Sequence, residues 1–123
     1  MRIPGFIARQ FYVAGSLRNT DGGFQLQAQN PMGDGVLVGV GQMRIDGRDI
    51  SPDSVTAQRP GDPTPIRATD VSATNPVEVS RGDHVTLHVS GPSLALGEHE
   101  LDVELFERNM GQLSFAISDT VAG

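Results

Sequence analysis

The three histidines are the side chains in this sequence best suited to bind a metal ion or to exchange a proton near neutral pH. His84 and His88 lie four residues apart in an alternating run, so on a strand they would share a face but lie roughly 13 Å apart, at ~3.3 Å per residue. Zinc takes ligands at about 2 Å, so this pair alone cannot chelate it. We therefore expect His84, His88 and His99 to be surface or interface histidines, with pH sensing as the alternative role, and we predict no metal site in this chain.

Other residue types that perform catalysis lack the spacing that catalysis requires. Asp46, Asp49 and Asp53 do not alternate as the ligands of a calcium loop do. The sequence has no cysteine nucleophile, no serine in a nucleophile elbow and no glycine-rich phosphate loop. Arg81-Gly82-Asp83 spells an adhesion motif, but it is more simply a turn in which the glycine takes an unusual dihedral angle. We therefore predict no catalytic residue in this chain.

Three loops carry side chains that core packing does not explain. Arg18 and Asn19 precede a glycine-rich reversal, Met32 lies in the loop that follows, and residues 108–110 (Arg-Asn-Met) come after an acidic strand. Arginine and methionine are enriched in protein interfaces, and arginine is a frequent hot spot. The alternative is ordinary polar decoration of loops. We favour a partner surface, because all three loops contain asparagine and two of them pair it with arginine.

Composition narrows the class of protein. The 123 residues suit one domain, 1–123, and the absence of cysteine rules out disulfides and favours a reducing compartment. The net charge is −6, and all the basic residues are arginines without a basic run, so we expect no nucleic-acid partner. No apolar run approaches the roughly 20 residues of a membrane span, and Arg9 and Gln10 interrupt the start of the chain. We expect a cytoplasmic protein that contacts no membrane.

Short alternating runs separated by glycine and proline predict an all-β fold: an antiparallel β-sandwich, jelly-roll or immunoglobulin-like, in a single domain. Asp46-Gly47 is a strong two-residue hairpin signal, and Leu101, Val103 and Leu105 alternate toward the core. We expect a loop over residues 59–65 and one helical turn within 68–75. The candidate strands are residues 11–17, 23–29, 36–45, 48–50, 55–58, 77–79, 84–90, 98–106 and 112–118.

Sugar-binding sandwiches grip their ligands through exposed aromatic faces, chiefly tryptophan and tyrosine. This chain has no tryptophan and one tyrosine, Tyr12. That composition argues against independent capture of a sugar. A free-standing carbohydrate- or protein-binding module is kept as the alternative function.

Three segments resemble a known family. Residues 12–24 read Tyr-Val-Ala-Gly-Ser-Leu-Arg-Asn-Thr-Asp-Gly-Gly-Phe, residues 43–47 read Met-Arg-Ile-Asp-Gly, and residues 94–103 read Leu-Ala-Leu-Gly-Glu-His-Glu-Leu-Asp-Val. In this order and spacing they resemble the small (β) subunit of bacterial C-glycoside deglycosidases, from about residue 12 to residue 106. The chain departs from that family's pattern at residues 30–36, where an aromatic-Arg-Gly run is replaced.

The resemblance implies an accessory β subunit of a carbon–carbon lyase. Its partner would be a TIM-barrel α subunit that carries a divalent metal, expected to be manganese, and the acid–base residues. The complex would cleave the sugar–aglycone bond of a 3-oxo-C-glycoside, such as a flavonoid C-glycoside, bound at or near the interface. An enolate formed at the sugar would be stabilised by the metal. This chain itself would hold no cofactor.

On this reading, Arg18 and Asn19 would be polar anchors on the barrel, and Phe24 would fix the strand that presents them. The full set of expected interface residues is Arg18, Asn19, Phe24, Met32, Arg108, Asn109 and Met110.

Overall fold

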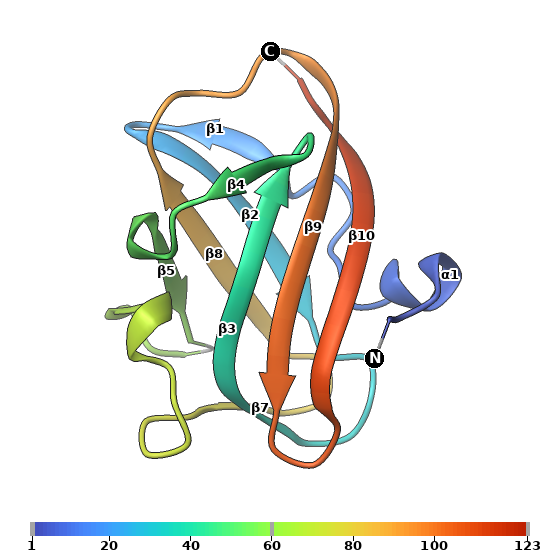
Figure 1. Cartoon of the computed structure of the whole chain (residues 1–123), viewed down its shortest axis with the longest axis vertical. Helices are drawn as coiled ribbons and strands as arrows, with labels where there is room; N and C mark the ends of the chain where they lie inside the picture. The colour runs from blue at the N-terminus through green and yellow to red at the C-terminus, as the bar shows by residue number, and fades with distance from the viewer. Residues whose placement is uncertain (1, 60, 123) are drawn as a thin grey trace.

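The computed structural model describes residues 2–59 and 61–122, and in this part of the chain ten strands form two antiparallel sheets that face each other (Figure 1). The first sheet has the strand order β1-β2-β8-β5-β6. Its strands are β1 (Arg18–Thr20), β2 (Gly23–Gln29), β8 (His84–Ser90), β5 (Val55–Gln58) and β6 (Pro65–Arg67).

The second sheet contains the longest strands. Its order is β10-β9-β3-β4, and β7 pairs with β3 as well. Because β4 pairs with the last residues of β3 and β7 with its first, one edge of β3 is shared between two short strands. Two facing antiparallel sheets confirm the predicted all-β sandwich. The strands are β10 (Gly111–Val121), β9 (Gly97–Glu107), β3 (Gly35–Ile45), β4 (Arg48–Ile50) and β7 (Val77–Val79).

The β3–β4 hairpin forms where the Asp-Gly signal predicts it. Asp46 and Gly47 both have positive φ angles, 52° and 80°. This combination is typical of a type I′ turn, whose twist matches that of the flanking strands. Ile45 therefore pairs directly with Arg48 across the turn.

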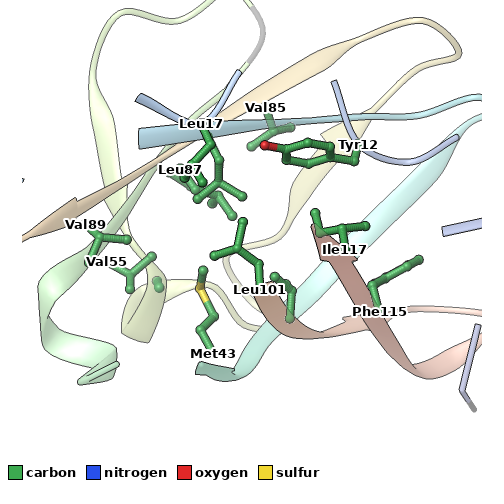
Figure 2. Close-up of a cluster of buried hydrophobic side chains, with 14 of the residues drawn as sticks. Tyr12, Leu17, Met43, Val55, Val85, Leu87, Val89, Leu101, Phe115 and Ile117 are labelled. Carbon is green, nitrogen blue, oxygen red and sulfur yellow. The ribbon is translucent and has the colours of Figure 1, made fainter. Parts of the chain in front are cut away.

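Both sheets contribute side chains to one apolar core (Figure 2). Leu87 of β8 lies across the sandwich from Leu101 of β9 and Met43 of β3, and the latter two are at most 2% exposed. Each large side chain buried in this way stabilises the fold by roughly 1.5–3 kcal/mol. The rings of Phe11 and Phe115 pack with centroids 5.2 Å apart.

Residues 11–17, predicted as a strand, do not form one. Tyr12 makes a single isolated bridge to Ala28, and Gly15 then turns the chain with a φ of 81°. The alternation of apolar residues indicated extended backbone, but the left-handed glycine ends the pairing. The strand begins only at Arg18.

Asp119 of β10 holds this irregular segment against the sheet. The Tyr12 hydroxyl donates to Asp119 Oδ2 at 2.5 Å, and the backbone N–H groups of Gly15 and Leu17 donate to the same oxygen at 3.0 and 3.3 Å. Burial raises the pKa of the Tyr12 phenol, and the hydrogen bond to the carboxylate raises it further. The segment is thus fixed without strand pairing.

Several short elements complete the fold. Helix α1 (Gly5–Ala8) and strands β1 and β6 were not among the predicted elements. The single helical turn expected within residues 68–75 is the 3₁₀ turn η2 (Ala68–Asp70), and a second one, η1 (Pro52–Ser54), precedes β5. The predicted loop over 59–65 ends at Pro65, the first residue of the edge strand β6, and includes residue 60, which lies outside the described residues. Within the described ranges, no helix has the length and apolarity needed to cross a membrane.

Candidate functional site

A cavity of about 290 Å³ lies between the two sheets. Its walls come from both sheets, with Val85 on one side and Val40 and Leu105 on the other, and the surface they present is almost entirely carbon. The lining also includes Met32 and Met110, both exposed. The cavity therefore opens at the end of the sandwich where the β9–β10 turn lies (Figure 1).

Small side chains leave this space between the sheets. Sheets in a sandwich pack about 10 Å apart, and alanines such as Ala28 and Ala57 in the lining fill little of that spacing. Elsewhere the larger Leu17, Met43 and Leu101 fill the core, and none of them lines the cavity.

Irregularities in β3 shape one wall. The register between β3 and β9 shifts between Leu37 and Gly39, and again between Val40 and Met43. On a regular strand, residues three apart point to opposite faces. Here Leu37 and Val40 both line the cavity. The register shift between Leu37 and Gly39 is a β-bulge that adds one residue to β3, so the side chain of Val40 points inward like that of Leu37.

Asn30 holds the loop on one side of the mouth. Its Nδ2 donates to the carbonyl oxygens of Gly33 at 3.0 Å and Val79 at 3.2 Å, while its Oδ1 accepts from the Met32 N–H at 3.0 Å. This asparagine turn joins the loop to the end of β7. Met32 is 51% exposed, yet Asn30 bonds to its backbone N–H and to the carbonyl oxygen of the next residue, Gly33.

Glu107 holds the opposite side. Its Oε2 accepts from the Val36 N–H at 2.9 Å, and its Oε1 accepts from Asn109 and Met110 at 2.7 and 2.8 Å. The Val36 bond first, and then those from Met110 and Asn109, lowers the pKa of the Glu107 carboxyl below its usual value although burial opposes this. Glu107 is therefore a buried anion that ties the β9–β10 turn to β3.

The structure brings one group of predicted interface residues together. Met32 and the 108–110 turn lie at the same mouth, and Met110 is 42% exposed. Arg108 and Asn109 are exposed on the same turn. The sequence placed Asn30 at the start of the Met32 loop but did not predict that its side chain holds this loop, although Asn-Pro is a turn signal. Nothing in the local pattern pointed to Glu107.

The remaining predicted residues lie at the other end of the sandwich, near the β1–β2 turn (Figure 1). Arg18 is exposed, and the Gln25 amide, with its oxygen turned toward Arg18, accepts from Nε and Nη2 at 3.0 Å each. The Asn19 side chain donates to Leu94 O at 2.9 Å and accepts from Leu94 N–H at 2.8 Å. Both therefore have structural partners, and their role in a partner contact stays a prediction.

Phe24 does not present a surface. It is 4% exposed and belongs to the core cluster. Its place on β2 fits the expectation that it fixes this strand. Its burial shows that the prediction of Phe24 as a residue that touches a partner was wrong. The alternation of residues 24, 26 and 28 already indicated that this side chain points inward.

His99 corrects the expectation that all three histidines lie at the surface or at an interface. It is 8% exposed, with Nδ1 2.6 Å from Asp46 Oδ2 and Nε2 2.7 Å from Ala95 O. Both nitrogens face acceptors, so the ring binds as an imidazolium that donates twice. The bond to Ala95, followed by that to Asp46, raises the pKa of His99, although burial opposes the shift. The sequence contained a signal for this burial, because His99 lies two residues before Leu101 and therefore on the same inward face of the strand.

The other two histidines do not form a metal site. His84 is exposed, and His88 Nε2 lies 2.8 Å from Thr20 Oγ1 of the edge strand β1, across the intervening strand β2. Across residues 2–59 and 61–122, no three histidine or carboxylate side chains gather closely enough to hold a metal ion. The geometry thus offers an apolar cavity with methionines at its mouth, and side chains committed to structural bonds around it.

A family model describing the hydroxymethylglutaryl-CoA reductase N-terminal domain matches residues 7–122. The chain belongs to this family. The hydroxymethylglutaryl-CoA reductase N-terminal domain family takes its name from part of a reductase, so it is an enzyme-associated domain family. The comparison with curated proteins gives no match.

Membership in the hydroxymethylglutaryl-CoA reductase N-terminal domain family corrects the resemblance to C-glycoside deglycosidase β subunits. The family match spans the whole stretch on which that resemblance was based, residues 12–106. The shared segments include the Asp-Gly turns at Gly22 and Gly47, both with positive φ, and alternating strands. Any antiparallel sandwich needs such segments, so they carry little information about family.

Proposed function

We propose that this chain is a non-catalytic accessory domain that binds the catalytic part of an enzyme with the end of the sandwich that carries Met32 and Met110. The observation that carries the proposal is the exposure of these two methionines at one mouth, on backbone that Asn30 and Glu107 hold in place. Methionine is enriched at interfaces because its unbranched side chain adapts to a partner surface.

Two further points support a binding role. The exposed large apolar side chains among the described residues are Phe6, Met32, Leu96 and Met110, and the two methionines are the pair that shares one site. The asparagine and glutamate bonds order both loops before a partner arrives, which lowers the entropic cost of association. The choice of an enzyme as partner class is supported by the family's description, which names part of a reductase.

The lyase reaction is not part of this proposal. The 3-oxo-C-glycoside substrate, the TIM-barrel α subunit and its manganese followed from the deglycosidase resemblance, which the family match replaces. The accessory role itself does not depend on that substrate. It requires only a surface that fits another protein.

Site-specific photo-crosslinking tests the proposal. A benzoylphenylalanine placed at position 32 or position 110 in the native host is expected to form an adduct with one and the same protein. That protein is then purified and titrated with the unmodified chain. Substituting both Met32→Ser and Met110→Ser is expected to weaken the measured affinity at least tenfold.

Leu96 provides the matched control, because it is 67% exposed and lies toward the other end of β9. The same crosslinker at position 96, and the substitution Leu96→Ser, should leave adduct formation and affinity unchanged. The proposal fails if positions 32 and 110 give no adduct, or if position 96 gives the same one.

A further inference from the structure

We propose that the cavity between the sheets is a binding site for a small, uncharged, apolar molecule larger than a single benzene ring, which enters between Met32 and Met110. This inference concerns the interior of the sandwich and goes beyond the docking of a protein partner at its rim. Either could fail without the other.

The size and chemistry of the cavity support this class of ligand. Its volume, about 290 Å³, is roughly twice that of the ~150 Å³ engineered apolar cavity that binds benzene, and it lies close to the ~300 Å³ lower limit of natural ligand pockets. Leu26 and Val85 of the first sheet and Val40, Leu105 and Phe115 of the second present only carbon to it. A ligand would therefore be held by apolar contact and by shape.

Two polar groups beside the apolar walls are already committed. The Tyr12 ring forms part of the wall, but its hydroxyl is bonded to Asp119 outside the lining. The Glu107 carboxylate accepts three backbone N–H groups. A buried ligand with strong donors or acceptors would find no free partner among these groups and would lose its bonds to water.

The negative charge of the lining disfavours anionic ligands. Asp34, Asp83 and Glu107 line the cavity, and its described lining contains no arginine or lysine. A carboxylate or phosphate head group in the cavity would face these three carboxylates, while Arg108 of the neighbouring turn lies outside the lining. A neutral molecule carries no such penalty. Fatty acid anions should therefore bind less well than the corresponding alcohols.

The mouth can admit a ligand without unfolding. Met32 and Met110 are exposed at its two sides, and unbranched methionine side chains change rotamer easily. Their backbones stay fixed through Asn30 and Glu107. Entry thus requires movement of two side chains only.

Fluorescence titration with the neutral probe N-phenyl-1-naphthylamine tests the site on the whole chain. We expect saturable binding of one probe per chain, displaced by 1-decanol, and displaced at least tenfold less well by decanoate. Non-saturable uptake, or equal displacement by the anion, overturns the proposal.

Methionine methyl resonances locate the bound probe without any substitution. The Met32 and Met110 methyl signals are expected to shift on titration. Met43 is buried in the core but does not line the cavity, so its signal is the internal control and should stay in place. A shift at Met43 with none at the other two would place the probe elsewhere and overturn the proposal.

A filling variant completes the test. Val40→Phe extends a side chain into the cavity and is expected to weaken probe binding at least tenfold, whereas Val89→Leu enlarges a buried residue outside the lining and should bind like the unmodified chain. Unchanged binding by a folded Val40→Phe variant contradicts the site. If that variant does not fold, the methyl shifts of the unmodified chain decide the question alone.

Discussion

His99 and Asp46 form an ion pair at the β3–β4 turn, with Nδ1 2.6 Å from Oδ2. The other oxygen of Asp46 accepts the Glu100 N–H at 2.9 Å, and the other nitrogen of His99 reaches Ala95 O at 2.7 Å. Asp46 therefore joins the hairpin to strand β9, and His99 joins that strand to the segment that leads into it. Two of these three hydrogen bonds involve the imidazole, so its charge state affects both of them.

This pair predicts that the chain becomes less stable above neutral pH. The pKa of His99 is raised in the folded state, so its contribution is fully present below the unfolded value of ~6.5 and is lost as pH rises through the higher folded pKa. Urea unfolding between pH 5 and pH 9 should show this decline, by about 1.4 kcal/mol for each unit of difference in pKa. His99→Gln should flatten the profile, and an unaltered slope in that variant would assign the effect to another group.

Replacing the buried carboxylate of Glu107 should destabilise the mouth of the cavity. In Glu107→Gln an NH₂ group replaces one carboxylate oxygen, and this group cannot accept a hydrogen bond. At least one of the three N–H donors therefore loses its partner, which should lower the free energy of unfolding by about 1–3 kcal/mol. Because the folded pKa of Glu107 is depressed, the difference should be present above the ordinary glutamate pKa and vanish as pH falls through the depressed value. Chemical unfolding at several pH values measures this, with exposed Glu98→Gln as control.

Gly23 should tolerate no side chain. A Cβ at this position would overlap the backbone carbonyl oxygen of Val89 on the paired strand β8, which cannot rotate away. Gly23→Ala is expected to cost at least about 3 kcal/mol, the upper end of ordinary substitutions. At Gly33 an added Cβ meets nothing within 4 Å, so Gly33→Ala should be nearly neutral. Similar melting temperatures for the two variants would contradict this close approach.

Asn19 and Arg18 should differ in their effects on stability. Asn19→Ala removes both bonds to the Leu94 backbone and should cost about 1–3 kcal/mol, whereas Arg18→Ala at the exposed edge should stay within ~0.5 kcal/mol. Thermal unfolding of the two single variants checks this. If Arg18 contacts a partner as predicted, the Arg18→Ala variant keeps its stability but loses affinity for the crosslinked partner. If Arg18→Ala and Asn19→Ala destabilise the chain equally, that result counts against the structural role of Asn19.

Alternation in the sequence predicted most of the sandwich, because a half-buried strand must repeat every second residue. Strands β2, β5 and β8 have the predicted bounds, and the Asp46-Gly47 turn forms as expected. Strand β1 could not be found in this way, since Arg-Asn-Thr has no apolar alternation and becomes a strand by pairing with β2. Pairing across the sheet decided its structure, which local propensity does not describe.

The candidate site was predictable only in part. Exposed Met32 and Met110 could be identified from residue type, but their convergence depends on Glu107, which joins residues 36, 109 and 110. The cavity depends on which side chains face each other across two sheets and on a bulge that turns both Leu37 and Val40 inward. Neither the facing side chains nor the bulge can be predicted from a single sequence, because both depend on the register between strands that are distant in the chain.

The pairing of β2 with β8 and of β3 with β9 has a consequence for how the chain folds. Each pair joins a strand from the first half of the chain to one from the second half, so the first sheet cannot be completed until residue 90 has been synthesised, nor the second until residue 121 has. Such non-local topologies fold in milliseconds to seconds rather than microseconds. During synthesis one edge of β2 and one edge of β3 stay unpaired until β8 and β9 emerge, and unpaired strand edges make such a partly folded chain prone to aggregation.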